Sequence, residues 1–295
     1  MKSKGPSQEK LYEIIREAPD DGSVTRTEKI SMSFSSATYN VLASAYIQRA
    51  WYPRTPAMVL NPAWRVPALV QYVSRLKADV LCLQEVEAET FVALRTFLAQ
   101  LEYGAQYARK NARQPEGCAI FYRENVFELL STRVIAYADG GGVAPDTGNI
   151  ALCALFRSAG GILGVINTHL TWDPPSTARN AQMGPRQTRQ LLTEYEKSVS
   201  DARGWIIAGD FNVTPDSEII NAVERAGLTY AHRGLTDVFT CNVNSNARMI
   251  DYIFNSSTLA SVAQLPVAID NNTILPSAEQ PSDHVPLMAK FDWSN

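Results

Sequence analysis

Short apolar runs alternate with longer amphipathic stretches along most of this chain. Each run has the length and the β-branched content that are typical of a buried strand. The clearest run, at 205–208, ends at Gly209 and is followed by Asp210 and Asn212. The amphipathic stretches repeat apolar residues every three or four positions, so each predicts a helix with one buried face.

The apolar runs and the amphipathic stretches together predict an ordered set of elements. Strands are expected at residues 36–42, 79–86, 118–122, 127–134, 150–156, 162–168, 205–208, 249–254 and 287–291. Helices are expected at 64–77, at 88–101 with Leu101 on the buried face, at 185–199 and at 217–226. Asp216 is the expected N-cap of the last helix, and Gly227 follows its end. Many strands with few helices favour two sheets packed together and covered by helices.

The pattern divides the chain into two parts of unequal size. Residues 1–33 are polar and weakly patterned, so we expect an N-terminal tail. No repeat or linker interrupts the remainder, which predicts one domain at 34–293.

Composition narrows the function classes. The formal net charge of −3 over 295 residues excludes a general polyanion binder, so an RNA or nucleotide substrate would need a local site. The four cysteines are far apart in apolar runs, which indicates buried thiols in a reducing compartment. No apolar run approaches the roughly 18 residues of a membrane span, and no secretory signal is visible. We therefore expect an intracellular, cytoplasmic protein without a membrane partner, and, because no docking domain is visible, a monomer.

A set of polar residues follows or interrupts the apolar runs, at positions that would lie near sheet edges. The set comprises Asn40, Glu85, His169, Asp210, Asn212, Asp251, Asp283 and His284. Carboxylate oxygens favour Mg²⁺ or Mn²⁺ over zinc. A bound cation beside imidazole and amide donors is what attack on a phosphate ester needs. Taken singly, each residue could equally be a cap or turn residue. The evidence for a functional site is that all of them occur together.

Two further polar groups fall outside this set. His232 belongs to none of the patterns above, and we interpret it as structural. Arg109, Lys110 and Arg113 form a small basic cluster near Tyr107, which is as typical of a solvated loop as of a substrate contact.

Seven sequence blocks, in order, carry a family resemblance. They are TYNVLA at 38–43, ADVLCLQEV at 78–86, EGCAIFY at 116–122, NTHLTWDP at 167–174, GDFNVTPDS at 209–217, IDYI at 250–253 and PSDHVPL at 281–287. The chain resembles the endonuclease/exonuclease/phosphatase superfamily, and within it the deadenylase–nocturnin–Angel branch. The resemblance implies an α/β fold, a four-layer α/β sandwich with two packed mixed β-sheets flanked by helices, and a site at one end.

The resemblance also implies how the cation would be held. Glu85 would be the principal ligand of Mg²⁺, with Mn²⁺ as an alternative. Asn40 would assist at the metal or at a second ion and would contact the substrate, and Asp251 would belong to the metal and histidine-orienting network.

Further roles follow from the same resemblance. Asp210 would orient or deprotonate the attacking water, Asn212 would bind the scissile phosphate, and His169 would donate to a phosphate oxygen. His284 would act as base or transition-state donor, with Asp283 fixing its tautomer. The sequence leaves open whether Asp210 or His284 takes the proton. Trp172 and Pro174 would pack against a base or ribose, although Trp172 could equally be a core residue.

The expected activity is that of a Mg²⁺-dependent phosphodiesterase acting on RNA or nucleotides, most like a 3′–5′ exoribonuclease of deadenylase type. A nocturnin-like phosphomonoesterase acting on NADP and a catalytically silent nucleotide- or RNA-binding module are the alternatives. Deadenylases of this branch carry a phenylalanine that stacks on adenine shortly before the Ile-Asp-Tyr block. Residues 244–248 contain no aromatic residue here, so a preference for poly(A) is not implied.

Overall fold

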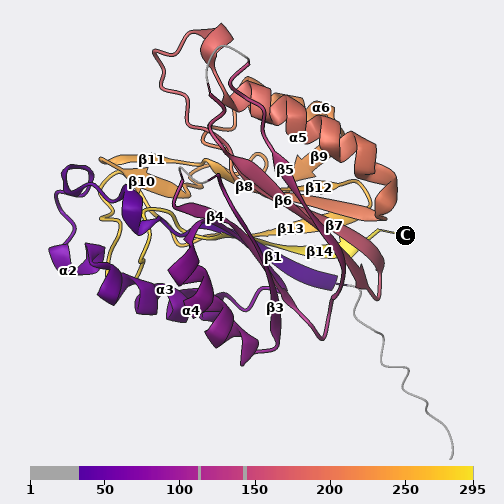
Figure 1. Cartoon of the computed structure of the whole chain (residues 1–295), viewed down its shortest axis with the longest axis horizontal. Helices are drawn as coiled ribbons and strands as arrows, with labels where there is room; N and C mark the ends of the chain where they lie inside the picture. Colours follow the sequence, from indigo (N-terminus) through magenta and orange to yellow (C-terminus); the bar gives the residue numbers. More distant parts are fainter. Residues whose placement is uncertain (1–32, 112–113, 142–144, 295) are drawn as a thin grey trace, which may run out of the picture. The chain divides into compact units, whose positions relative to one another are not determined.

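The computed structural model describes residues 33–111, 114–141 and 145–294, in which two six-stranded sheets lie between layers of helices (Figure 1). The first sheet has the order β13 (Leu259–Gln264), β14 (Leu287–Trp293), β1 (Ser33–Asn40), β2 (Val80–Glu87), β4 (Glu116–Arg123) and β3 (Tyr103–Arg109). The second has the order β5 (Glu128–Ala136), β6 (Ile150–Ser158), β7 (Gly161–His169), β8 (Gly204–Asp210), β12 (Asp251–Ser256) and β9 (Leu228–Tyr230).

Both sheets are mixed. The pairs β1–β2 and β7–β8 are parallel, and the other pairs within the two sheets are antiparallel. A separate hairpin joins β10 (Cys241–Val243) to β11 (Asn246–Arg248). The predicted four-layer α/β sandwich is confirmed.

Helices cover the outer face of each sheet (Figure 1). On the first sheet lie α3 (Pro62–Leu76) and α4 (Ala88–Ala99), preceded by the short α2 (Ala57–Leu60) and two 3₁₀ turns, η1 (Ser44–Tyr46) and η2 (Arg49–Trp51). On the second lie α5 (Gly184–Ser198) and α6 (Glu218–Arg225), with η3 (Arg179–Ala181) and η4 (Val199–Asp201) flanking α5.

The period-two pattern of each strand explains the layers. On β2, Val80 and Cys82 face the core between the sheets, whereas Leu81 and Leu83 face the helices. Apolar side chains on both faces make β2 a fully buried strand, which is why its sequence shows an unbroken apolar run.

Some boundaries differ from the sequence predictions. The N-cap of α6 is Ser217 rather than Asp216, because the Ser217 hydroxyl accepts a hydrogen bond from Ile220 N at 3.2 Å. α4 ends at Ala99, so Leu101 lies beyond it and is 37% exposed instead of buried. Strands β3 and β13 were not predicted, because small and polar residues interrupt their apolar positions.

Other expectations concern the N-terminus and the cysteines. The predicted tail at residues 1–33 lies outside the described residues, except for Ser33, which begins β1. All four cysteines are buried free thiols, as predicted. None of the helices in the described ranges combines the length and the apolar character that crossing a bilayer requires.

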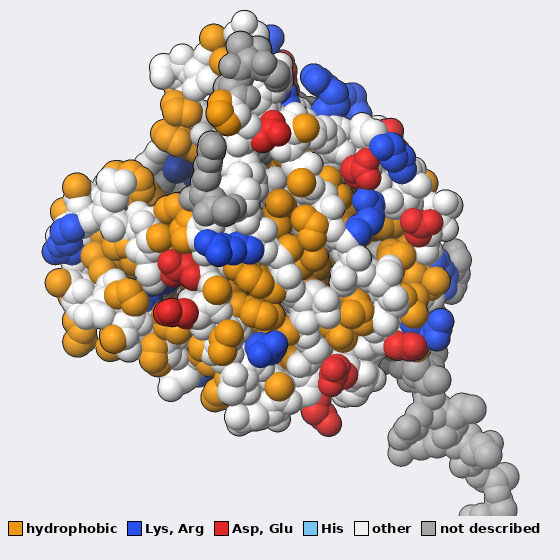
Figure 2. Space-filling view, viewed as in Figure 1, with side chains coloured by type: hydrophobic (Ala, Val, Ile, Leu, Met, Phe, Trp, Pro, Cys, Tyr) orange, Lys and Arg blue, Asp and Glu red, His pale blue; other side chains and the backbone are white. Residues whose placement is uncertain are grey.

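Charges of both signs are interspersed on the face shown in Figure 2. Among the described residues of this face, Lys and Arg side chains lie next to Asp and Glu instead of forming one basic field. Any polyanion bound there would therefore depend on a local site, as the net charge of −3 also indicates.

Gly209 places Asp210 at the end of β8, and we expect no side chain to be tolerated there. Its φ is +153°, and a Cβ atom would lie 1.9 Å from the backbone oxygen of Thr168. Gly209→Ala should therefore lower the free energy of unfolding by about 3 kcal/mol, measured by urea denaturation. As a control, Gly227→Ala adds a Cβ atom into open space at φ +84° and should cost only about 1 kcal/mol. Equal losses in the two variants would contradict the close approach at Gly209.

Candidate active site

Asp210 ends β8, and each neighbouring strand places a predicted site residue opposite it. His169 on β7 and Asp251 on β12 both pair in register with Asp210. The first sheet contributes Asn40 from the end of β1 and Glu85 from β2. The candidate site therefore lies at one end of the sandwich, where the two sheets meet.

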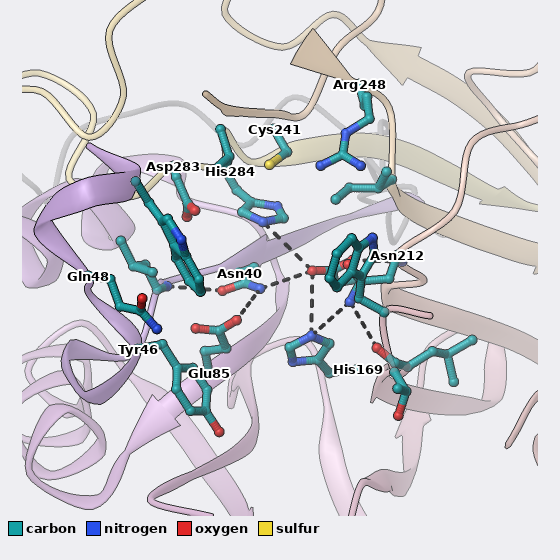
Figure 3. A pocket seen from close by; sticks show the side chains of 18 of the residues that line it. Asn40, Tyr46, Gln48, Glu85, His169, Asn212, Cys241, Arg248, Asp283 and His284 are labelled. Atoms are coloured by element: carbon teal, nitrogen blue, oxygen red, sulfur yellow. Dashed lines mark hydrogen bonds and ion pairs between the residues drawn. The ribbon is translucent and has the colours of Figure 1, made fainter. Parts of the chain in front are cut away.

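One oxygen of Asp210 is the meeting point of groups from both sheets. Asn40 Nδ2 donates to Asp210 Oδ2 at 3.0 Å, and Nε2 of His169 and Nε2 of His284 each lie 3.7 Å from the same oxygen (Figure 3). The other oxygen, Oδ1, accepts a hydrogen bond from Asn212 N at 2.9 Å. Burial, and then the neighbouring charge of Asp251, raise the pKa of Asp210 above its usual range.

Glu85 is held next to this cluster by two donors. Asn40 Nδ2 donates to Oε1 at 3.0 Å, and Ala43 N donates to Oε2 at 2.8 Å. Burial raises the pKa of Glu85 to about 7, and the charges of Glu116 and Asp283 add to the rise. The Asn40 amide oxygen accepts a hydrogen bond from Leu42 N, so the amide nitrogen faces the carboxylates. Metal ligation by Asn40 stays a prediction.

Two of these residues have a left-handed backbone. Glu85 has a φ of +57° where β2 and β4 change register, and Asn212 has a φ of +57° just after β8. Residues other than glycine avoid this region, at a cost of order 1–3 kcal/mol. Because the backbone is irregular at these two positions, both side chains reach the cavity, which the alternating directions of a regular strand would not ensure.

The partner of His284 corrects one sequence prediction. Its Nδ1 lies 2.8 Å from Asp251 Oδ2, so Asp251, and not Asp283, orients the ring. Asp283 instead accepts a hydrogen bond from the Tyr52 hydroxyl at 2.8 Å. Burial would lower the pKa of His284, but Asp251 and then Cys241 raise it well above its usual value. The surroundings of His284 therefore favour its protonated form.

His169 has the opposite electrostatic environment. Its Nε2 lies 3.1 Å from Asn212 Nδ2, and its Nδ1 lies 3.5 Å from Lys110 Nζ. Burial, followed by the charges of Lys110 and His284, lowers the pKa of His169 well below its usual value. His169 is therefore neutral, and the two imidazoles of the site favour different protonation states.

Lys110 is the member of the basic cluster that the structure brings into the site. It is buried, and its ammonium group forms an ion pair with Glu116 at 2.6 Å. Arg109 is exposed and donates to the backbone of Gln114, whereas Arg113 lies outside the described residues. The solvated-loop interpretation holds for Arg109 only, and Lys110 lines the cavity.

A cavity of about 810 Å³ opens above these groups and contains most of the predicted set (Figure 3). This volume is within the range of small-molecule sites in proteins. Trp172 lines the cavity and is exposed, so it is not a core residue. Pro174 is also exposed but does not line the cavity, because the chain has already turned away, and its predicted contact with a base is not supported.

Many cavity residues were not among the predicted site residues, and four of them besides Lys110 carry large aromatic or charged side chains. They are Tyr46, Trp51, Tyr52 and Arg248. Tyr46, Trp51 and Tyr52 come from the loop after β1, where the sequence has no regular pattern. Their aromatic character in a loop was the available signal. Arg248 ends β11, in the stretch that lacks the expected aromatic residue, and its guanidinium group points into the cavity (Figure 3).

A family model supports the resemblance that the sequence blocks indicate. The model, described as the Endonuclease/Exonuclease/phosphatase family, matches residues 37–284. The chain belongs to this family. The match covers every residue of the candidate site described above.

Curated relatives refine the position of the chain within the Endonuclease/Exonuclease/phosphatase family. Protein angel homolog 2 of Mus musculus is 26% identical over 276 residues, which cover 87% of this chain and 50% of that protein. The CCR4-Not complex 3′-5′-exoribonuclease subunit Ccr4 of Mycosarcoma maydis is 25% identical over 369 residues, covering 97% and 54% respectively. The chain thus spans about half the length of these relatives, and the predicted branch is confirmed.

A solved structure has the same architecture. ANGEL2, described as a 2′,3′-cyclic phosphatase and crystallised with adenosine-2′,3′-vanadate, aligns with a TM-score of 0.75 and 25% identity. The alignment covers 88% of this chain and 95% of the ANGEL2 chain.

The donor set of the site fits a hard divalent cation. Glu85 offers carboxylate oxygens whose pKa is raised first by burial and then by the charges of Glu116 and Asp283, so a cation bound there would stabilise the ionised form. Asp210, Asp251 and His284 also offer ligand atoms that lie within 4.8 Å of one another. Oxygen-rich groups of this kind suit Mg²⁺ or Mn²⁺.

Because the pKa of Glu85 is about 7, cation binding should compete with a proton near neutral pH. Protonation removes the charge that binds the cation, so the Mg²⁺ affinity should be constant above about pH 8 and fall about tenfold per unit below pH 7. Calorimetric titration between pH 5.5 and 8.5 measures this dependence.

Two variants serve as the test and the control for this pH dependence. Glu85→Gln should abolish Mg²⁺ binding. Glu87→Gln should leave binding intact, because Glu87 accepts hydrogen bonds from Ser44 N and Ala45 N and does not line the cavity. An affinity that is independent of pH, or loss of binding in Glu87→Gln, would contradict the assignment of Glu85.

Proposed function

We propose that this chain hydrolyses phosphodiesters at the 3′ end of RNA with Mg²⁺, as a 3′–5′ exoribonuclease. The observation that carries the proposal is the convergence on Asp210 Oδ2 of the Asn40 amide and the imidazoles of His169 and His284. The name of the related Ccr4 proteins as 3′-5′-exoribonuclease subunits supports the choice of reaction.

The cation would be held principally by Glu85, with Mn²⁺ as an alternative to Mg²⁺. A bound divalent cation neutralises charge on the phosphate and polarises its oxygens. The carboxylate of Glu85 is preorganised for this role, because Asn40 and Ala43 fix both of its oxygens.

Asp210 is the group that accepts the proton of the attacking water. It is a better base than an exposed carboxylate, since burial and Asp251 raise its pKa. His284 is less suited to that role, because Asp251 at 2.8 Å favours the protonated form of its ring. The proton therefore moves from water to Asp210 as the water oxygen bonds to phosphorus. The bond between phosphorus and the 3′ oxygen of the penultimate nucleotide breaks, that oxygen takes a proton from solvent, and the terminal nucleotide leaves with its 5′ phosphate.

The remaining groups bind the phosphate. His284 donates from Nε2 to a phosphate oxygen as negative charge develops there. Asn212 Nδ2 lies between His169 Nε2 and the backbone oxygen of Leu170, at 3.1 and 2.9 Å, which directs the amide towards the same space. Neutral His169 can donate one further hydrogen bond without adding charge.

Hydrolysis of a 2′,3′-cyclic phosphate is the second candidate. Its support is the alignment with ANGEL2 at 25% identity, together with one departure from deadenylases. Residues 244–248 lack the aromatic residue that deadenylases carry shortly before the Ile-Asp-Tyr block. Both reactions need the same cation and the same phosphate contacts, so the substrate decides between them.

We also infer that the enzyme acts as a monomer in the cytoplasm. Every group named above comes from one chain, so no second copy is needed to complete the site. The four buried free thiols suit a reducing compartment.

A substrate panel with Mg²⁺ tests the proposal directly. We expect progressively shorter labelled products from 5′-labelled oligo(A) and oligo(U), abolition by chelator, and a loss of roughly 10³-fold in Glu85→Gln but not in Glu87→Gln. Cleavage limited to an oligonucleotide ending in a 2′,3′-cyclic phosphate would favour the second candidate. Phosphate release from NADP with intact oligonucleotides would indicate a phosphomonoesterase, and binding without turnover would indicate a silent binding module.

The roles of Asp251 and Asp283 can be separated by pH profiles. Asp251→Asn removes the charge that raises the pKa of His284, so the loss of activity at alkaline pH should begin at a lower pH. The maximal rate should fall by roughly 10²–10⁴-fold. Asp283→Asn should cause a smaller loss and leave the alkaline limb unchanged, because Asp283 contacts Tyr52 and Ser282 and not the ring. The reverse result would restore Asp283 as the partner of His284.

A further inference from the structure

Two exposed tryptophans share the cavity. All five tryptophans of the chain lie in the described residues, and Trp205 and Trp293 are buried while Trp64 is half-buried. Trp51 and Trp172 are 43% and 53% exposed, and both line the cavity. A single exposed aromatic residue is ordinary, but a pair of them in one polar cavity indicates a surface kept open for a ligand.

Trp51 belongs to the wall that carries His284. The next residue, Tyr52, donates from its hydroxyl to Asp283 Oδ2 at 2.8 Å, directly beside His284. The same loop reaches the β10–β11 hairpin, because Arg54 Nη2 donates to Ser245 Oγ at 3.2 Å.

Trp172 belongs to a different wall. It follows β7 three residues after His169, and Asn212 Nδ2 donates to Leu170 O in the same segment at 2.9 Å. The segment is anchored on α5 and not on the hairpin. Trp51 and Trp172 are therefore held by different elements, and both line the cavity that contains Asp210.

The backbone at both positions is fixed, although the side chains are exposed. Thr171 N donates to Gln187 Oε1 at 2.8 Å, and the Asp173 carboxylate accepts from Met183 N and Gly184 N at 2.9 and 2.8 Å. These bonds pin the chain on either side of Trp172. A rigid aromatic surface loses little entropy when it binds a ring.

The loop that carries Trp51 is fixed in the same way. Trp51 N donates to Gln48 O at 2.9 Å, and Arg49 Nη1 donates to Tyr52 O at 2.8 Å. Arg49 also contacts Thr55 O, so one guanidinium group closes the whole loop.

We propose that Trp51 and Trp172 are stacking platforms for the two nucleosides that flank the scissile phosphate. The substrate class that follows is an RNA of at least two nucleotides, with one base on each side of the reacting centre. The proposal rests on the proposed function only for the position of the phosphate, at the Asp210 cluster. Stacking does not read the base edge, so this site should accept different bases and need no adenine-specific aromatic residue.

Binding of a dimer that cannot be hydrolysed tests the proposal. The probe is diadenosine with a methylphosphonate linkage, which is neutral and needs no cation, and its affinity is measured by calorimetry. Stacking on an aromatic ring contributes about 1–3 kcal/mol per base, so Trp51→Ala and Trp172→Ala should each weaken binding by roughly 5- to 150-fold. Trp51→Phe and Trp172→Phe should recover most of the loss, because phenylalanine also stacks.

Adenosine alone and a surface aromatic residue provide the controls. Adenosine can use either platform, so each single alanine variant should change its affinity by at most about twofold, whereas the double variant should abolish binding. Phe97→Ala removes an aromatic residue that is 38% exposed on α4, outside the cavity, and should leave dimer binding unchanged.

The outcomes separate this inference from the proposed function. Dimer affinity within twofold of wild type in either alanine variant, or equal weakening by Phe97→Ala, would overturn the paired platforms even if the enzyme cleaves RNA. The expected pattern without any RNA cleavage would leave the platforms in place and reject the exoribonuclease assignment.

Discussion

The candidate site depends on how the two sheets are aligned, because each sheet contributes part of it. Apolar side chains between the sheets stabilise their contact but have no directional preference. The buried side-chain amides of Gln84 and Asn167 make directional hydrogen bonds that fix how one sheet is positioned against the other. Gln84 Nε2 donates to Asn167 Oδ1 at 2.7 Å, and Asn167 Nδ2 donates to Leu83 O and Ala119 O at 2.9 and 2.8 Å. These bonds join β2 to β7 one residue before Glu85 and two before His169, so sliding of the sheets would leave buried polar groups without partners.

The residues of the site lower the stability of the folded chain. Burial raises the pKa of both Glu85 and Asp210, which means that their charged forms are less favourable in the folded chain than in water. Left-handed backbone at Glu85 and Asn212 adds to this cost. The surrounding sheets hold these groups in place, and a bound cation would relieve part of the repulsion. The burial that weakens the fold is also what makes Asp210 a better base.

The sequence predicted the layers and most of the site for a common physical reason. A polar residue at the end of a fully apolar strand stands out, and Asn40, His169 and Asp210 were found in this way. The assignment of Asp283 as the partner of His284 was wrong. Asp251 and Asp283 both belong to family blocks, and only the three-dimensional structure shows that Asp251 faces the His284 ring.

Other features escaped sequence analysis because their signals were weak. Strand β3 (YGAQYAR) mixes small, polar and aromatic residues, and its place next to β4 is determined by pairing and not by its own pattern. Trp51 lies in an irregular loop, so nothing in its neighbours indicated where its ring would lie. For Pro174 the sequence suggested too much. Its matching block predicted a contact with a base or ribose, but Pro174 does not line the cavity.

The order of strands in the first sheet has a consequence for biosynthesis. β1 lies between β2 and β14, so a strand from the beginning of the domain pairs along its length with one from its far end. His284 immediately precedes β14, and contacts of such large sequence separation form late in folding. A nascent chain still emerging from the ribosome would hold Glu85 and Asp210 without His284. The cluster around Asp210 would therefore be completed only after the segment through Trp293 had left the ribosome and paired with β1.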